Sequence, residues 1–169
     1  MIEAHTQKES LIKGEALNFT QMMHKYNDSL TSGHRADLRR VRLPEDLEMI
    51  PAYYRLLLPD VRPGRQWLRV VFMFPWAIHS DNADSLGMVL ERARVSEVRL
   101  FQMIRANEPQ DLLYLRRLCQ QIKPIVDWQR FGRALYYWGS NAKRAIIEEF
   151  YMAEAKDSGK QDAKMTKGE

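Results

Sequence analysis

The sequence predicts an all-α protein, a compact helical bundle of about eight to nine helices, with two small helical lobes as the alternative. Three observations support this fold class. Apolar residues recur at helical spacing along most of the chain, proline and glycine separate these stretches, and no strand-like run has a second run to pair with. We assign residues 1–156 to a single helical domain and residues 157–169 to a polar, disordered C-terminal tail.

The first predicted helix covers residues 9–27, where Phe19 and Met22 belong to a loosely periodic apolar face. Gly33 ends that region. A short segment with closely spaced arginines follows at residues 35–42. This segment is the first candidate for contacts with an anionic partner.

Pro44 begins the next helical region, because proline fits the first helical position and Glu45 and Asp46 follow it in the first turn. Pro51 divides this region into two short helices, and Pro59 ends it.

Residues 66–78 form a helix that is apolar nearly all round, which predicts a central position in the core. Pro75 kinks or ends it. The run LRVVFMF also fits a strand, but we prefer a helix because no partner strand is evident.

A polar loop at residues 79–84 leads to a short helix at residues 85–92. The stretch 91–118 then reads as two amphipathic helices with arginines outside and apolar side chains inside. Asn107 resembles the N-cap of the second, with Gln110 three residues on.

Residues 127–138 place four large apolar side chains on one stripe, and Gly139 and Ser140 separate this helix from the last one. Ile146 and Phe150 face the core in the final helix.

The net charge of +4 is unevenly distributed along the chain. Residues 1–34 carry a net charge of −1 and residues 145–169 a net charge of −2, whereas residues 35–144 hold every arginine and carry +7. Arginine is preferred where planar, bidentate phosphate contacts matter, although an ordinary ion-paired surface would have the same composition.

Nothing in the sequence points to catalysis, a metal or a cofactor. It has no glycine-rich phosphate loop, no GxSxG and no HExxH motif. His79 and Asp81 lie in a polar loop, where such pairs are usually solvated, and Glu148 and Glu149 point about 100° apart on a helix. A lone Cys119, no apolar run near the ~20 residues of a membrane span and no signal peptide pattern indicate a cytoplasmic protein.

Nine basic side chains are candidates for nucleic-acid contacts: Arg39, Arg40, Arg65, Arg99, Arg105, Arg116, Arg117, Lys143 and Arg144. Arg39 and Arg40 could instead pair with Asp37 or Glu45, and Arg65 with Asp60. Arg99 and Arg117 point away from the apolar stripes of their helices, Arg116 lies on the flank, and Arg105 lies at a stripe edge, where a structural role is equally consistent.

Lys143 and Arg144 occupy the first turn of the last helix, where the macrodipole disfavours cations by ~0.3–1 kcal/mol. A bound phosphate would offset this cost, and so would acids of a neighbouring helix. Aromatic residues do not alternate with basic ones, so we expect backbone recognition and not base readout.

Four segments, in this order, resemble the CasB family, the small subunit of the type I-E CRISPR complex Cascade: DLRRVRLPEDLEMIPAYYRLL at 37–57, RLFQMIRA at 99–106, LRRL at 115–118 and DWQRFGRALYYWG at 127–139. The resemblance covers roughly residues 35–152. It implies an all-helical, non-catalytic subunit present as two copies. Such a subunit lies against the backbone subunits that carry the CRISPR RNA, and holds the target and displaced DNA strands to stabilise the R-loop.

By position, the resemblance places the family's basic contacts on seven of the nine candidates: Arg39, Arg40, Arg65, Arg99, Arg105, Arg116 and Arg117. It implies other Cascade subunits, a second copy of the chain, CRISPR RNA and target DNA as partners, with no membrane and no small-molecule ligand. Two alternatives are a free-standing DNA-binding regulator of the helix-turn-helix type and an architectural adaptor whose arginines contact acidic proteins.

Overall fold

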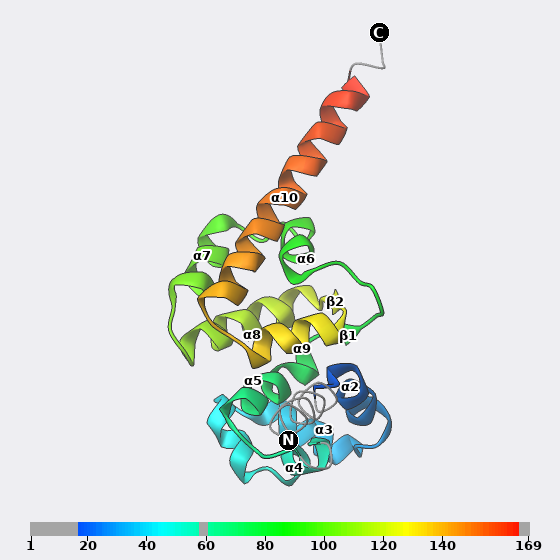
Figure 1. The fold of residues 1–169 in the computed structure, drawn as a ribbon, viewed down its shortest axis with the longest axis vertical. Coiled ribbons are helices and arrows are strands. Elements are labelled where there is room, and N and C mark those ends of the chain that lie inside the picture. Colours follow the sequence, from blue (N-terminus) through cyan, green and yellow to red (C-terminus); the bar gives the residue numbers. More distant parts are fainter. Residues whose placement is uncertain (1–16, 58–60, 166–169) are drawn as a thin grey trace, which may run out of the picture. The chain divides into compact units, whose positions relative to one another are not determined.

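A computed structural model describes residues 17–57 and 61–165, with side chains placed through residue 160. Within these ranges the chain is mostly helical, which confirms the predicted all-α class (Figure 1). It divides into two compact units, residues 1–75 and 76–169. We describe each unit by itself.

The described part of the first unit begins with α2 (Phe19–Asp28) and α3 (Ser32–Arg40). Asn18 and Thr31 cap them, because their side-chain oxygens accept the backbone N–H groups of Gln21 and His34 at 2.9 and 3.1 Å. The described part of the first predicted helix is α2, and residues 9–16, where that helix was expected to start, lie outside the described residues. Gly33 lies inside α3 and does not end a helical region, because Thr31 begins a new helix just before it.

The proline-based predictions for the next segment are confirmed. The 3-10 helix η1 (Pro44–Met49) and α4 (Pro51–Leu56) each begin with a proline. Asp46 holds the start of η1, since its Oδ2 accepts the backbone N–H groups of Arg42 and Leu43 at 3.2 and 2.9 Å. Pro59, the expected end of this region, lies outside the described residues.

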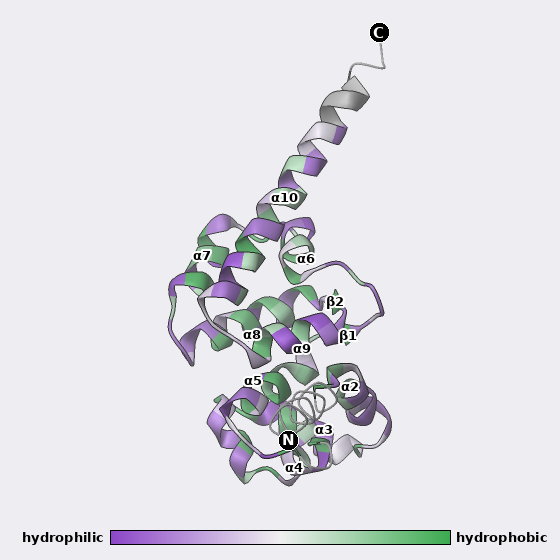
Figure 2. Cartoon of the chain, viewed as in Figure 1, coloured by the Kyte–Doolittle hydropathy of each residue, from purple (hydrophilic) through white to green (hydrophobic). Residues whose placement is uncertain are grey.

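The apolar run is helical, as preferred over the strand alternative: it forms α5 (Arg65–Met73) and the short 3-10 helix η2 (Phe74–Trp76) at Pro75. Figure 2 shows α5 as strongly hydrophobic, and its side chains from Trp67 to Met73 are buried apart from Arg69. The Phe19 and Trp67 rings lie 5.7 Å apart and anchor α2 on α5.

The second unit contains a feature that the sequence did not indicate, a two-stranded parallel sheet of β1 (Ile78–His79) and β2 (Ile125–Val126). Ile78 and His79 were expected at a helix end and in a solvated loop. Instead, Ile78 N donates to Pro124 O at 2.9 Å, and two-residue strands this far apart in sequence leave no periodic pattern to detect.

Five helices complete the second unit: α6 (Leu86–Arg92), α7 (Glu97–Arg105), α8 (Gln110–Ile122), α9 (Trp128–Tyr136) and α10 (Ser140–Met165). The predicted N-cap Asn107 is wrong, because Pro109 occupies that position without a side-chain cap. Asn107 contributes only its carbonyl oxygen, which accepts Asp111 N at 3.1 Å.

The largest packing interface in this unit joins α6 to α10. Gly87 makes it possible, because a Cβ atom there would lie 2.4 Å from the carbonyl oxygen of Ile146. Beyond this contact, α10 continues past α6 and α7 and becomes mostly hydrophilic (Figures 1 and 2).

The helix thus continues through Met165, where we expected a disordered tail from residue 157. Alanine, glutamate and lysine near residues 153–156 are strong helix formers and no proline interrupts them, so the helix extends beyond the packed part.

Candidate nucleic-acid interface

The basic helix pair of α7 and α8 presents Arg105 and Arg117 to solvent. The Arg105 guanidinium carbon lies 5.2 Å from the ring centre of Phe101, and that of Arg117 lies 5.9 Å from the ring centre of Tyr114. A shallow groove between the two helices is lined by Phe101, Arg105 and Tyr114. Arg105 therefore lines this groove, and Arg117 lies near the ring of Tyr114, which lines it too. In both cases an aromatic face lies next to the guanidinium group.

Arg99 differs from expectation. It is only partly exposed, and its Nη1 donates to Oε1 of Gln121 on α8 at 2.6 Å. The helical wheel of α7 alone placed it towards solvent, but α8 packs beside α7 and supplies this partner.

Arg116 is also partly exposed. Burial lowers the pKa of its guanidinium from the ordinary value, and the neighbouring charge of Arg117 lowers it further.

Three candidates belong to the first unit. Arg39 and Arg40 are exposed in the last turn of α3, where cations interact favourably with the helix macrodipole. Arg40 pairs with Asp37 at 3.4 Å, and both side chains are largely exposed, so this pair contributes little and is easily exchanged for a phosphate. Arg65 is exposed at the first position of α5.

Lys143 has a structural partner. Its Nζ lies 2.7 Å from Oδ2 of Asp111 and donates to the carbonyl oxygen of Ala106 at 2.8 Å. The same Oδ2 accepts the indole N–H of Trp138 at 2.8 Å, and the backbone N–H of Leu112 donates to Oδ1 at 2.7 Å. Only 14% of the Lys143 side chain and 2% of that of Asp111 are exposed.

The sequence left two explanations open for a cation at the start of α10, a bound phosphate or an acid of a neighbouring helix. The structure supports the second, because Asp111 of α8 balances the charge of Lys143. Arg144, the next residue, is exposed. Of the two cations in this turn, Arg144 is the one available to a ligand.

The His79 neighbourhood is structural. Nδ1 accepts the backbone N–H of Trp128 at 3.1 Å, and Nε2 lies 3.0 Å from Oδ1 of Asp81. The histidine side chain is 10% exposed, so it was wrongly expected to be solvated. It joins β1 to the start of α9.

Across residues 17–57 and 61–165 we find no cluster of histidine, cysteine and carboxylate groups suited to a metal ion. Nor is any helix in this part of the chain long and apolar enough to cross a membrane.

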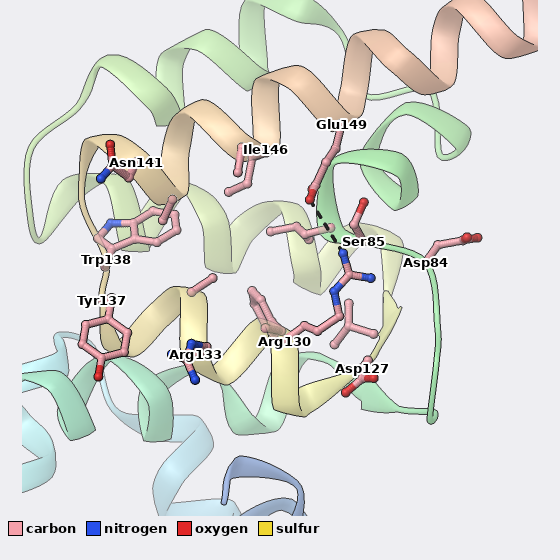
Figure 3. Close-up of a pocket in the computed structure, with 16 residues that line it drawn as sticks. Asp84, Ser85, Asp127, Arg130, Arg133, Tyr137, Trp138, Asn141, Ile146 and Glu149 are labelled. Atoms are coloured by element: carbon pink, nitrogen blue, oxygen red, sulfur yellow. Dashed lines mark ion pairs between the residues drawn. The ribbon is translucent and has the colours of Figure 1, made fainter. Parts of the chain in front are cut away.

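Sequence reasoning missed one feature of the second unit, a pocket of about 410 Å³ between α9, α10 and the start of α6 (Figure 3). Arg130, Arg133 and Tyr137 line it. They recur at helical spacing on α9, away from the buried stripe, and this pattern alone indicates an ordinary solvated face. The pocket exists only because α10 packs beside that face.

Comparison with known proteins identifies the family. The sequence profile of CRISPR-associated protein Cse2 matches residues 34–151. The chain is 34% identical over 144 residues to CRISPR system Cascade subunit CasB of Escherichia coli strain K12, covering 76% of this chain and 90% of that protein.

Two solved structures have a similar fold. A chain in the crystal structure of E. coli Cascade bound to a PAM-containing double-stranded DNA target matches with a TM-score of 0.77 and 33% identity, over 82% of this chain and 97% of that one. M. ruber CasB matches with a TM-score of 0.63 and 19% identity, over 82% and 95%, and supports the fold alone. The chain belongs to the Cse2 family, the family of CasB, a non-catalytic small subunit of type I-E Cascade.

Proposed function

We propose that this chain is the small subunit of a cytoplasmic type I-E Cascade complex. In this role it contacts the phosphate backbones of the target and displaced DNA strands and so stabilises the R-loop in antiviral defence. Its partners are the other Cascade subunits, a second copy of the chain, CRISPR RNA and target DNA. The chain itself performs no chemical step.

One observation carries the proposal beyond family membership. Every arginine lies in residues 35–144, and several of them are exposed on helices and have no strong acidic partner among residues 17–57 and 61–160. Arg105 and Arg117 rest on aromatic rings, and Arg40 has only a weak surface pair. Such groups can exchange their present contacts for phosphate oxygens at small cost.

The physical role follows from the energetics of strand exchange. The RNA–DNA duplex formed in an R-loop is about as stable as the DNA duplex it replaces, so protein–backbone contacts decide how far the exchange proceeds. A subunit with ordered arginines supplies this free energy without reading sequence, which base pairing already does.

The test uses the assembled complex. We expect Arg39→Gln with Arg40→Gln, and separately Arg105→Gln with Arg117→Gln, to reduce the fraction of target duplex opened. The matched control removes two exposed arginines outside the candidate set, Arg55→Gln with Arg62→Gln. If both candidate pairs open target as well as the control pair does, the assignment of these residues is wrong.

A further inference from the structure

The pocket between α9, α10 and the start of α6 combines apolar, aromatic and arginine side chains in its lining. Phe131 on α9 and Ile146 on α10 contribute apolar side chains to its lining. The aromatic residues Tyr137 and Trp138 lie at one end of it (Figure 3). Tyr137 remains 57% exposed. The pocket volume of about 410 Å³ is ample for one flat heteroaromatic ring.

The carboxylates around this pocket already have partners. Asp84 pairs with Arg92, and Asp127 caps α9 through the backbone N–H of Gln129. Glu149 accepts the backbone N–H of Gly87 at 3.3 Å and lies 3.9 Å from Nη2 of Arg130, a long contact that spans the pocket in Figure 3. The hydrogen bonds and ion pairs of these acids therefore connect the elements that form the pocket walls.

The arginines of the pocket have weaker interactions with acids than the carboxylates have with their partners. Arg133 forms no ion pair with an acid in the described part of the chain, and its guanidinium carbon lies 5.7 Å from the ring centre of Tyr137. Arg130 remains 61% exposed beside its long contact with Glu149. The exposed Arg144 follows the pocket residue Asn141 by three positions, on the neighbouring part of the α10 surface.

We propose that this pocket binds one unpaired nucleobase of a single-stranded nucleic acid. The base stacks on Tyr137 and the planar guanidinium of Arg133, the amide of Asn141 meets a polar edge of the base, and Arg130 and Arg144 attract the adjoining phosphates. This inference rests on the proposed function and deepens it: the subunit holds an unpaired strand by a base as well as by its backbone.

The combination of groups favours a nucleotide over a protein side chain. An aromatic face with an arginine plane stacks any base, which suits a subunit that must tolerate every target sequence. The adjoining cations match the phosphates that accompany every base, whereas an apolar side chain from a partner protein brings no such charge.

The test compares two single-stranded oligodeoxynucleotides of equal length, one with all its bases and one with abasic sites in the middle. Both carry the same number of phosphates. We expect the full-length chain to bind the intact strand at least about fivefold more tightly than the abasic strand at the same salt concentration, as a single stacked base provides.

Two variants remove the site in different ways. Tyr137→Leu deletes the stacking ring, and Ala145→Met fills the pocket without changing charge; Ala145 is an exposed pocket residue, so the longer side chain fits the helix. In both, the ratio of the two affinities falls to about one. Tyr137→Phe keeps the wild-type ratio, and so do the matched controls Tyr54→Leu and Ala155→Met, which change exposed residues that do not line the pocket.

The possible contrary results distinguish a failure of the pocket proposal from a failure of the proposed function. Equal binding of intact and abasic strands by the wild-type chain shows backbone contact alone and overturns the pocket, while leaving the proposed function standing. A ratio retained in both variants overturns it too, because the base then stacks elsewhere. Binding of neither strand overturns the pocket, whereas the proposed function is decided separately by duplex opening in the assembled complex. Variants that impair only assembly with other subunits also overturn the pocket as a base site and identify a protein docking site instead.

Discussion

At the scale of single residues, the buried group of Asp111, Lys143 and Trp138 shows how a basic side chain becomes structural. Three donors converge on the Asp111 carboxylate, and the Lys143 ammonium lies 2.7 Å from it. Charged groups taken out of water are stable only when paired and hydrogen-bonded, and here both are. Lys143 is therefore tied to the fold more than to any ligand.

We expect Asp111→Asn to lower the free energy of unfolding by about 3 kcal/mol, the low end for a broken buried pair because part of Lys143 stays exposed. Urea unfolding measures this. Asp37→Asn, which breaks the exposed pair with Arg40, serves as the control and should cost less than about 1 kcal/mol. Equal losses in the two variants would contradict a buried role for Lys143.

Cys119 on α8 makes stability depend on alkaline pH. Burial raises the pKa of its thiol to about 12, from an ordinary value of 9.0. Between these two values the unfolded chain loses a proton that the folded chain keeps, so the unfolded state binds fewer protons and the free energy of unfolding falls as pH rises.

The expected decline above pH 9 approaches about 1.4 kcal/mol per pH unit from this one group. Below pH 9 its contribution is constant. Urea unfolding between pH 8 and pH 10 measures the slope, and Cys119→Val should flatten it. A slope that is the same in the variant would show that the thiol is not the cause.

At the scale of elements, the contact between α6 and α10 depends on a missing side chain. A Cβ atom at Gly87 would lie 2.4 Å from the Ile146 carbonyl oxygen and 2.6 Å from Glu149 Cβ. Backbone atoms cannot yield as a flexible side-chain end can, so a larger residue must push the helices apart.

We therefore expect Gly87→Ala to destabilise the protein by about 1–3 kcal/mol, as overpacking in a core does, despite the better helix propensity of alanine. Thermal unfolding is the measurement. Gly139→Ala is the matched control, because no atom lies within 4 Å of a Cβ built there. If Gly87→Ala proves neutral or stabilising, the two helices do not pack as closely as described.

At the scale of the whole molecule, the segment with net charge +7 determines how the protein responds to salt. Each phosphate contact releases counterions, so the logarithm of the affinity for duplex DNA falls with the logarithm of salt concentration by about 0.9 per contact. We expect Arg117→Gln in the assembled complex to reduce this slope by about 0.9, and Arg99→Gln to change it less, because Gln121 already engages that guanidinium. A larger change in the slope for Arg99→Gln than for Arg117→Gln would instead favour a solvent-facing Arg99, as helix periodicity alone suggested.

The sequence by itself determined the helices and many of the positions at which they begin and end. Pro44, Asp46 and Pro51 act through local sterics and hydrogen bonds within a few residues, so their effects could be predicted without the fold. The concentration of arginine in residues 35–144 is likewise a property of the sequence, and the ordered segments that resemble CasB pointed to the family.

Only the tertiary structure decided which basic side chains are occupied and which are available. Lys143 meets Asp111 and Arg99 meets Gln121 across helices 32 and 22 positions apart in the chain, and no periodicity encodes such partners. The parallel pair of β1 and β2 and the pocket beside α9 arise in the same way, because each is made when distant segments pack together. Helix periodicity gives the direction of a side chain on its own element, whereas its partner depends on which element packs against it.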